Sequence, residues 1–454
     1  MLEWMITAPA SGSGKTILTC ALLAALKKRG YEPCAFKCGP DYIDPMFHRS
    51  VLGVESHNLD LFLAGEDAVR RMYARYSAGH GAAVTEGAMG FYDGLGGTTD
   101  RASAWHVADT LGLPVLLALR PKGASLTLAA QVNGLQSFRQ NSHIAGLFLN
   151  DCSAMLAKSL VPMLERETGL PVLGWLPHME EAVLESRHLG LYTAGEIENL
   201  SARIDCVADA LDGNLDWDQL EAIFSRREGR PAVPTAAAAD GVPIAVARDE
   251  AFCFAYAESL DALREAGASL RFFSPLRDAA LPEGTAGLYL PGGYPELHAA
   301  VLSENTDMRR AVREAVEQGL PTVAECGGFL YLGQSLEGGD GKSYPMAGAL
   351  PGNAVRRERL VRFGYAELSA EGESMLFRPG EAVPVHEFHY WDSTQNGEGL
   401  TAVKPLTGRS WKCGFVNDRL YAAFPHLYFA GRPELAERFV RAAKRYREER
   451  IYHE

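Results

Sequence analysis

The stretch Leu320-Pro-Thr-Val-Ala-Glu-Cys-Gly-Gly-Phe-Leu-Tyr-Leu332 decides how the second half of the chain is interpreted. Its first half is short and apolar, which is typical of a buried strand. Its second half begins with Gly327-Gly328 and then becomes apolar-periodic, as the start of a helix does. Cys326 therefore falls on a predicted tight strand-to-helix turn, where the helix N-terminus favours a thiolate nucleophile. The alternative is a buried structural cysteine, because free cysteine is often buried.

The composition of the chain is that of a globular protein. It has 454 residues, of which 47% are hydrophobic and 22% charged, and a net charge of -13. The length predicts two or three domains. The acidic balance, without a long basic run, argues against a nucleic-acid surface or an anionic membrane face. The eight cysteines include no CxxC pair, so neither a zinc cluster nor a disulfide framework is indicated. We expect a cytoplasmic protein, because no secretory leader and no apolar span of about 18 residues is found.

Strand-like and helix-like runs alternate from the first residues onward. This alternation predicts an α/β fold in which helices cover both faces of a parallel sheet. A Pro- and Ala-rich stretch interrupts it and is interpreted as a linker, residues 229–241. The alternation resumes at 243–247 and runs to the Cys326 strand. We therefore predict two doubly wound domains, residues 1–228 and 242–454.

The segment Ser11-Gly-Ser-Gly-Lys-Thr16 follows a predicted strand and precedes a predicted helix, which is the setting of a phosphate loop. Its lysine would reach the β- and γ-phosphates, and its threonine hydroxyl would reach Mg²⁺. The strict motif would begin with glycine at the position of Pro9, so this chain keeps only the working core of the motif. A chance Gly-Lys-Thr is the alternative. The predicted nucleotide contacts are Gly12, Ser13, Gly14, Lys15 and Thr16.

Acidic residues follow two further predicted strands, in Lys37-Cys-Gly-Pro-Asp-Tyr-Ile-Asp44 and in Glu86-Gly-Ala-Met-Gly-Phe-Tyr-Asp93. The carboxyl ends of parallel strands form the ligand crevice of such a sheet. Carboxylates at this edge can hold Mg²⁺ beside a triphosphate. A helix N-cap or a turn is the alternative for any single aspartate. We expect Asp41 and Glu86 to be the metal neighbours, because each closely follows a strand.

Together these motifs resemble the cobyrinic acid a,c-diamide synthase family over nearly the whole chain. The resemblance rests on the phosphate loop, both acidic motifs and four later segments: Arg248-Asp-Glu-Ala-Phe252, Pro291-Gly-Gly-Tyr-Pro-Glu296, Cys326-Gly-Gly328 and His386-Glu-Phe-His389. It implies an N-terminal P-loop ATPase domain similar to dethiobiotin synthetase and a C-terminal class I glutamine amidotransferase domain. It also implies a carbon–nitrogen ligase with glutamine as amido donor and with ATP and Mg²⁺ as cofactors.

The implied reaction converts the a and c carboxylates of cobyrinic acid into amides. ATP would turn each carboxylate into an acyl phosphate, which ammonia then displaces. The resemblance makes Thr16, Asp41 and Glu86 the Mg²⁺ neighbours. It places Asn150 at the adenine edge, with a simple turn as the alternative. Aspartates would repel a substrate carboxylate, so they are better interpreted as metal or ammonium contacts, or as partners of Lys37. The candidate substrate-site residues are Tyr42, Asp44, Asn58, Asp60 and Asp93.

Glutamine hydrolysis needs a thiolate, a base and an oxyanion hole. Cys326 would be the nucleophile, and the backbone N–H groups of Gly293 and Gly327 would form the oxyanion hole. The family position of the base falls on His426, for which a satisfied core histidine is the alternative. Many class I amidotransferases have glutamate two residues after this histidine, but Tyr428 occupies that place here. We therefore predict a Cys–His dyad, with a third member that is absent or comes from elsewhere.

Other functions remain open at this point. The same machinery could amidate hydrogenobyrinic acid or a nickel tetrapyrrole. A different class is a P-loop switch ATPase with an inactive amidotransferase-like domain, and a dethiobiotin-type ligase alone would leave the second domain unexplained. The partners we expect are small molecules (corrinoid, glutamine and ATP), with no nucleic acid and no membrane. A homodimer is an arrangement that the sequence leaves open.

Overall fold

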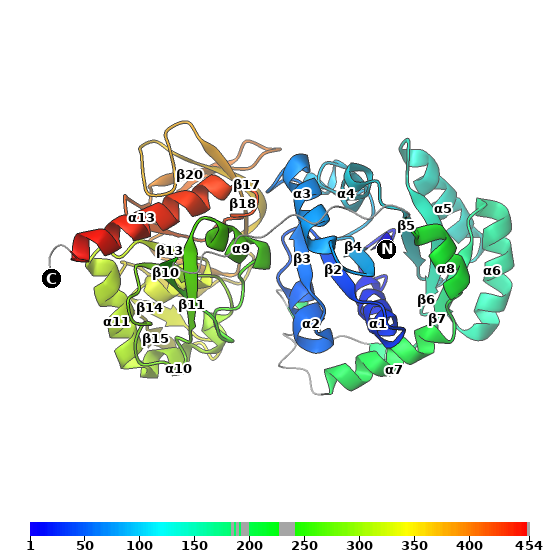
Figure 1. Cartoon of the computed structure of the whole chain (residues 1–454), viewed down its shortest axis with the longest axis horizontal. Coiled ribbons are helices and arrows are strands. Elements are labelled where there is room, and N and C mark those ends of the chain that lie inside the picture. Colours follow the sequence, from blue (N-terminus) through cyan, green and yellow to red (C-terminus); the bar gives the residue numbers. More distant parts are fainter. Residues whose placement is uncertain (183–185, 188–189, 192–198, 227–240, 452–454) are drawn as a thin grey trace. The chain divides into compact units, whose positions relative to one another are not determined.

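The computed structural model describes residues 1–182, 186–187, 190–191, 199–226 and 241–451. Its contacts divide the chain into two compact units, Met1–Pro234 and Thr235–Glu454 (Figure 1). All of the predicted linker 229–241 except Gly241 lies outside the described residues. The predicted domain ranges 1–228 and 242–454 stay predictions. No helix in the described parts of the chain combines the length and the apolar character that a bilayer span needs.

The first unit is built on a parallel sheet with the strand order β3-β2-β4-β1-β5-β6-β7. Successive connections lead from β1 toward one edge and later toward the other. Because crossovers between parallel strands are right-handed, this order puts helices on both faces. The predicted doubly wound fold is confirmed. The strands are β1 (Leu2–Thr7), β2 (Pro33–Cys38), β3 (Ser56–Leu59), β4 (Ala82–Glu86), β5 (Val115–Leu119), β6 (Ile144–Asn150) and β7 (Val172–Leu176).

Side-chain caps explain where several helices of this unit begin. Ser103, Ser153 and Asp216 each accept a hydrogen bond from a backbone N–H in the first turn of α4, α6 and α8. The helices are α1 (Lys15–Lys28), α2 (Ile43–Leu52), α3 (Glu66–Ser77), α4 (Ala104–Leu111), α5 (Leu126–Phe138), α6 (Ala154–Thr168), α7 (Leu200–Asp212) and α8 (Trp217–Phe224). Short elements complete the unit: the 3₁₀ turns η1 (Leu95–Gly97) and η2 (Glu180–Ala182), and the strand pair β8 (Ser186–Arg187) and β9 (Gly190–Leu191).

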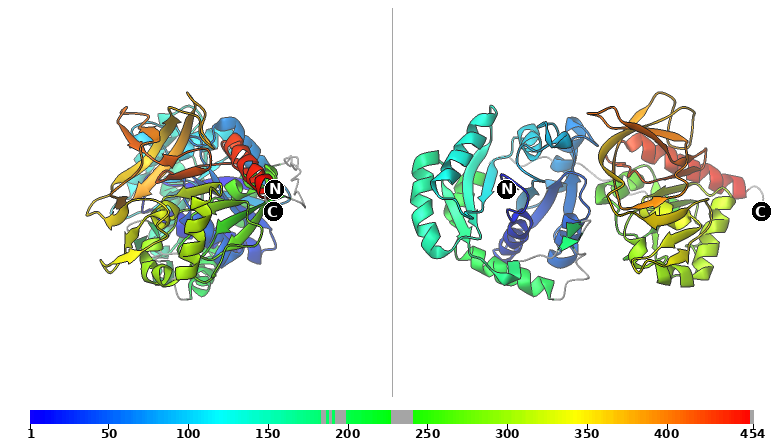
Figure 2. Two further views of the ribbon diagram at one scale, coloured as in Figure 1. Left: turned by 90° about the vertical axis from the view of Figure 1, so that its left-hand side faces the viewer. Right: turned by 180° about the vertical axis from the view of Figure 1, so that it is seen from behind.

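The second unit has a central sheet in the order β11-β10-β12-β13-β23-β22, parallel except for β22. Buried residues of helix α13 pack in the same cluster as residues of β10 and β12. Helix α13, drawn in red in Figures 1 and 2, contacts α9. The strands are β10 (Val242–Ala247), β11 (Ala268–Phe273), β12 (Gly287–Leu290), β13 (Thr322–Glu325), β22 (Phe415–Val416) and β23 (Leu420–Ala423). The helices are α9 (Ala257–Glu265), η4 (Pro295–Leu297), α10 (Ala299–Glu304), α11 (Thr306–Glu317), α12 (Gly327–Leu332) and α13 (Pro433–Ile451).

Between α12 and β23 the chain forms two further four-stranded sheets, which the alternation in the sequence does not predict. One has the order β15-β14-β16-β19, and the other, β18-β17-β20-β21, is antiparallel throughout. Their strands are β14 (Ser335–Glu337), β15 (Ser343–Pro345), β16 (Asn353–Arg356), β17 (Arg362–Ala370), β18 (Ala382–His389), β19 (Trp391–Ser393), β20 (Leu400–Val403) and β21 (Ser410–Cys413). The insertion matters for the site, because β18 pairs through His386 with His426.

Candidate active sites

The phosphate loop connects β1 to α1 and is held by close backbone contacts. Gly14 has a φ of 84° and precedes Lys15, the first residue of α1. A Cβ atom added to Gly14 would lie 2.0 Å from Nδ2 of Asn150. That amide nitrogen donates a hydrogen bond of 2.9 Å to the carbonyl of Ser13. Only glycine therefore fits at this point, and Asn150, at the end of β6, lies directly against the loop.

The Lys15 ammonium lies over the loop, with carbonyl oxygens as its partners. Nζ donates to the carbonyl of Met89 at 2.6 Å and to that of Ala10 at 3.2 Å. Burial and the nearby charge of Lys37 lower the pKa of Lys15 to about 8. This lysine comes from the start of α1, so its charge faces the place where the N-terminus of that helix favours an anion.

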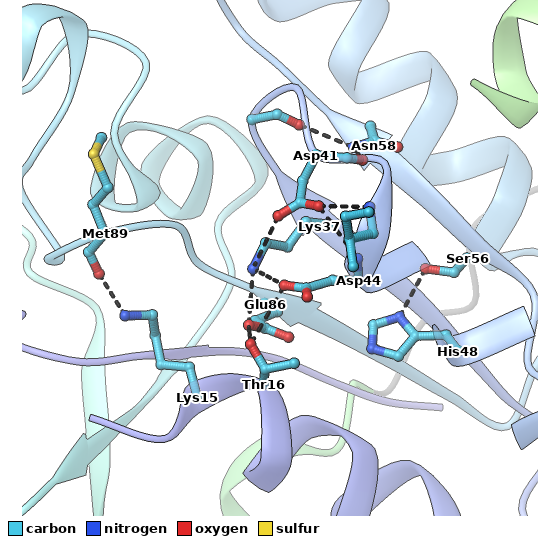
Figure 3. A network of polar contacts seen from close by, with 12 residues as sticks. Lys15, Thr16, Lys37, Asp41, Asp44, His48, Ser56, Asn58, Glu86 and Met89 are labelled. Carbon is cyan, nitrogen blue, oxygen red and sulfur yellow. Dashed lines mark hydrogen bonds and ion pairs between the residues drawn. The ribbon is translucent and has the colours of Figure 1, made fainter. Parts of the chain in front are cut away.

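A buried cluster of charges lies beside the loop, where β2 and β4 end (Figure 3). The ammonium of Lys37 donates to Glu86 at 2.8 Å and to Asp44 through a short hydrogen bond. The hydroxyl of Thr16 donates to Glu86 Oε1 at 2.8 Å and lies 3.4 Å from Asp44 Oδ2. These contacts bring together residues at the ends of β2 and β4 with residues of the helices α1 and α2 that follow β1 and β2, and Lys37 is indeed a partner of Asp44.

The charged groups in this cluster shift one another's pKa values. Burial raises the pKa of Glu86 to about 7, even though the Lys37 ammonium opposes that shift. Burial opposes the charge on Lys37 as well, but the neighbouring carboxylates outweigh it and hold its pKa well above the usual range. The pKa of Asp44 is lowered, because the same ammonium outweighs the effect of burial. The cluster thus keeps a lysine charged inside the protein by surrounding it with carboxylates.

Asp41 stands at the margin of this cluster. Its Oδ1 accepts hydrogen bonds from the N–H groups of Ile43, at 2.8 Å, and Asp44, at 3.2 Å. One of its two carboxylate oxygens is therefore engaged in capping the first turn of α2. Its Oδ2 lies 3.9 Å from Lys37 Nζ. Burial and the charge of Asp44 raise the pKa of Asp41 to about 6. Asp41 thus caps the first turn of α2 from the position before its N-cap residue, and Asp44 is the aspartate that contacts Thr16.

The donor set of the cluster fits Mg²⁺. Its ligands would be carboxylate and hydroxyl oxygens, which this cation prefers. Glu86 Oε2 is buried and has no hydrogen-bond partner among the described residues, so it is available to a cation. No three His, Cys, Asp or Glu side chains in the described ranges converge on a preformed metal site. In this cluster the ammonium of Lys37 already lies between the carboxylates of Asp44 and Glu86.

The other candidate substrate residues are engaged in shaping the loops. Asn58 donates to the carbonyls of Gly39 and Asp41, at 3.0 and 2.5 Å. Asp60 accepts from the N–H groups of residues 62 and 63, at 2.8 and 2.9 Å. Asp93 accepts from the N–H of residue 90 at 2.9 Å, and Tyr42 precedes α2 as its N-cap residue. Their part in binding a substrate stays a prediction, while their part in holding the crevice is visible.

In the second unit, Cys326 stands between β13 and α12, on the strand-to-helix turn that the sequence predicts. Its φ is 47° and its ψ is -104°, an uncommon conformation for a residue with a side chain. Its N–H donates to the carbonyl of Ala423 in β23 at 2.8 Å, and its carbonyl accepts from Leu330 at 3.0 Å. Strain of this kind costs about 1–3 kcal/mol and is concentrated at functional sites.

Glycines bring the backbone close to Cys326 and His426. A Cβ on Gly292 would lie 2.5 Å from Cε1 of His426 and 3.5 Å from Cβ of Cys326. A Cβ on Gly327 would lie 3.1 Å from the backbone nitrogen of Gly293. The glycine loop after β12 therefore packs against both the cysteine and the histidine. The two N–H groups expected to form the oxyanion hole belong to neighbouring residues in space.

His426 follows β23 and forms an antiparallel bridge with His386 of β18, to whose carbonyl it donates at 2.8 Å. Its Nδ1 lies 3.8 Å from Oε2 of Glu325, the residue just before the cysteine. Tyr428 donates instead to Glu258 of α9, at 2.9 Å. A carboxylate near the histidine thus comes from β13, and the sequence-based prediction of a dyad missed it. The signal that could have revealed it is a charged residue at the end of an otherwise apolar buried strand.

Burial raises the pKa of the Cys326 thiol, and the charges of Glu296 and Glu387 act in the same direction. Oε1 of Glu387 accepts a hydrogen bond from Nε2 of His389 at 2.9 Å, so these two side chains share one face of β18, as alternation along a strand predicts. The ring of His389 stacks on Phe424 with centroids 3.7 Å apart. A thiolate at Cys326 consequently needs a nearby positive charge, which a protonated His426 would supply.

Two family models match the chain, one in each unit. Residues 4–191 match the model of the CobQ/CobB/MinD/ParA nucleotide binding domain, and residues 243–434 match that of the CobB/CobQ-like glutamine amidotransferase domain. The chain is 40% identical to the cobyrinate a,c-diamide synthase of Synechococcus sp. over 97% of its length and 98% of that protein. The enzymes of the same name from Clostridium acetobutylicum and Salmonella typhimurium are each 38% identical, over 97% of this chain and 100% and 98% of theirs.

The chain belongs to the cobyrinate a,c-diamide synthase family. As the resemblance implied, it is a glutamine-dependent ligase with an N-terminal nucleotide-binding domain and a C-terminal amidotransferase domain. The nucleotide-binding domain implies that it uses ATP, and its substrates are small molecules, as in the rest of the cobyrinate a,c-diamide synthase family. The interpretation as a switch ATPase with an inactive second domain is therefore set aside.

Proposed function

We propose that this enzyme amidates the a and c carboxylates of cobyrinic acid, with ATP as the activating reagent and glutamine as the nitrogen source. Full-length similarity to enzymes of that name supports the choice of substrate. The observation that carries the chemistry is the pairing of two sites in one chain. One unit has a phosphate loop beside buried carboxylates, and the other has a cysteine on a strained turn against glycines and a histidine.

At the glutaminase site, the Cys326 thiolate attacks the side-chain amide carbon of glutamine. The N–H groups of Gly293 and Gly327 donate to the oxyanion that forms. His426 takes the thiol proton and returns it to the leaving nitrogen, so that ammonia departs and a thioester remains. Water then hydrolyses the thioester to glutamate and restores the thiol. The close packing of Gly292 against both side chains supports this assignment.

At the ligase site, a carboxylate oxygen of the substrate attacks the γ-phosphorus of ATP, and ADP leaves. Ammonia then attacks the acyl phosphate, and inorganic phosphate leaves. Lys15 and the loop N–H groups of Gly12, Ser13 and Gly14 hold the phosphates, and Asn150 reads the adenine edge. Mg²⁺ would be held by Thr16, Glu86 and the neighbouring aspartates, and it would supply charge compensation for the phosphates.

The remaining expectations extend this proposal. Asp41 and Asp44 are the aspartates that would contribute to the proposed cation site, and Lys37 balances their charge. Tyr42, Asn58, Asp60 and Asp93 shape the crevice that receives the corrinoid. The cytoplasmic location and the absence of nucleic-acid partners stay predictions from the sequence, and a homodimer stays an open arrangement.

The decisive experiment is a product assay with cobyrinic acid, ATP, Mg²⁺ and glutamine, scored by mass for one or two amidations. Hydrogenobyrinic acid and a nickel tetrapyrrole serve as competing substrates, and preference for either would replace cobyrinic acid in the proposal. The Cys326→Ala variant should lose glutamine-dependent product but form product from ammonium chloride. Full glutamine-dependent activity in that variant would overturn the assignment of the nucleophile.

A further inference from the structure

The pair formed by Glu325 and His426 is not explained by the two-residue glutaminase described above. Glu325 ends β13 and directly precedes Cys326, and its side chain is buried together with the histidine ring. Oε2 of the carboxylate lies 3.8 Å from Nδ1 of His426. A buried carboxylate needs partners that offset its desolvation. The partners of the Glu325 carboxylate therefore indicate its role.

Two hydrogen bonds hold the Glu325 carboxylate in place. Oε1 accepts from the backbone N–H of Leu427 at 3.0 Å, and Oε2 accepts from the hydroxyl of Tyr289 at 3.0 Å. Burial and the Glu325 charge raise the pKa of Tyr289 well above the usual range, so its hydroxyl keeps the donated proton. Leu427 directly follows the histidine. The carboxylate is thus tied both to the sheet and to the segment that carries His426.

Other groups near the histidine have different partners. Tyr428 binds Glu258. His386 contacts His426 through the backbone, and burial together with the charge of His426 lowers the pKa of His386 to about 3, so this ring is neutral. Glu387 is bound to His389. Glu325 has a carboxylate oxygen within 4 Å of the His426 ring.

We propose that Glu325 is the positioning residue of the glutaminase site, which orients His426 and stabilises its protonated form through Nδ1. This inference rests on the proposed function, because it assumes that His426 is the base for Cys326. The separation of 3.8 Å exceeds a hydrogen bond, and catalytic hydrogen bonds often shorten only when substrate is bound. Glu325 and Cys326 are consecutive residues, so one turn sets the positions of both the nucleophile and the carboxylate.

The test uses the full chain with Glu325→Gln and Glu325→Asp. We expect glutamine hydrolysis by Glu325→Gln to fall by about 100-fold or more, in line with the loss of an orienting carboxylate in a catalytic triad. Synthesis from ammonium chloride should be unchanged, which shows that the variant folds. Glu325→Asp keeps the charge and should recover part of the activity. If Glu325→Gln does not fold, Tyr289→Phe, which removes one of the two hydrogen bonds, should reduce glutamine hydrolysis alone.

A second measurement separates positioning from a simple charge effect. The rate of alkylation of Cys326 by iodoacetamide is followed against pH. The Glu325 charge by itself raises the thiol pKa, so its removal as a mere neighbour would move the alkylation midpoint to lower pH. If Glu325 sustains a protonated His426, its removal weakens the thiolate–imidazolium pair and moves the midpoint to higher pH. The control Glu258→Gln, which removes the charge of another buried carboxylate but keeps an oxygen that can accept from Tyr428, should leave the midpoint unchanged.

The outcomes are distinguishable. A midpoint at lower or unchanged pH in Glu325→Gln, or an equal shift in Glu258→Gln, overturns the role of Glu325 while the glutaminase itself stands. Glutamine hydrolysis that survives Cys326→Ala instead overturns the proposed function on which the inference rests. A shift to higher pH together with the selective loss of glutamine hydrolysis supports the positioning residue.

Discussion

The ammonium of Lys37 donates a hydrogen bond of 2.8 Å to Oε1 of Glu86, and water reaches only 6% of one side chain and none of the other. The two residues are separated by 49 positions and meet because β2 and β4 are neighbours in the sheet. Thr16 donates to the same oxygen from the phosphate loop. Glu86 therefore links the phosphate loop, through Thr16, to the buried ion pair with Lys37.

Replacing Lys37 should destabilise the N-terminal unit. In Lys37→Met the carboxylates of Asp44 and Glu86 lose their buried counter-charge, which costs about 3–5 kcal/mol of unfolding free energy. Urea denaturation of the purified variant measures this loss. Lys37→Met combined with Asp44→Asn should recover part of it, because fewer unpaired charges stay buried. If the unfolding free energy of Lys37→Met lies within about 1 kcal/mol of the wild-type value, Lys37 does not stabilise these buried carboxylates.

Glu86→Gln should impair amidation whichever nitrogen source is supplied. It removes a negative charge from the proposed Mg²⁺ site, so product formation from glutamine and from ammonium chloride should both fall by about 100-fold or more. The Mg²⁺ concentration for half-maximal activity should rise. Steady-state assays across a Mg²⁺ series measure both effects, with Glu55→Gln, a largely exposed carboxylate, as the control. A loss confined to glutamine would place Glu86 outside the ligase site.

Gly292→Ala should act on glutamine hydrolysis alone. The added Cβ would lie 2.5 Å from His426 Cε1, so the ring must move away from Cys326. A displacement of this size is expected to reduce hydrolysis by about 100-fold. Glutamate release measures the effect, and synthesis from ammonium chloride reports on the fold. Gly372→Ala is the matched control, because no atom lies within 4 Å of its added Cβ; an equal loss there would contradict the steric explanation.

His48 should make stability depend on pH. Burial lowers its pKa from 6.5 to about 4, and its Nδ1 lies 2.9 Å from the Ser56 hydroxyl. Between pH 6.5 and 4 His48 is protonated in the unfolded chain but stays neutral in the folded chain. Its contribution to the free energy of unfolding is therefore fully present above pH 6.5 and is lost as the pH falls toward 4. The loss amounts to about 3 kcal/mol.

The measurement for this prediction is the unfolding free energy of wild type and His48→Gln between pH 4 and 8. Subtracting the two curves removes the titration of the other groups. The advantage of the wild type should shrink by about 3 kcal/mol across the window and stay constant above pH 7. A difference that is independent of pH would show that His48 is not buried in its neutral form.

The backbone setting of the phosphate loop and of Cys326 could be predicted because its sequence signals are local. The phosphate loop and the Cys326 turn are each defined by a few consecutive residues, whose glycines and flanking apolar runs specify the backbone. His426 and the glycines at 292 and 293 came from the family resemblance. The metal neighbours stay a prediction. The sequence did not indicate which aspartate contacts Thr16, because Asp41 and Asp44 are three residues apart and only the start of α2 decides it.

The sequence by itself determined the order of the functional motifs along the chain: the phosphate loop, the acidic motifs, the cysteine turn and then the histidine. Periodicity and turn residues carry that information within short windows. Only the tertiary structure decided that Lys37 stands between carboxylates, that Glu325 and not residue 428 faces His426, and that two extra sheets separate β13 from β23 along the chain. These relationships join residues about 50 to 100 positions apart, and strand order and register determine them.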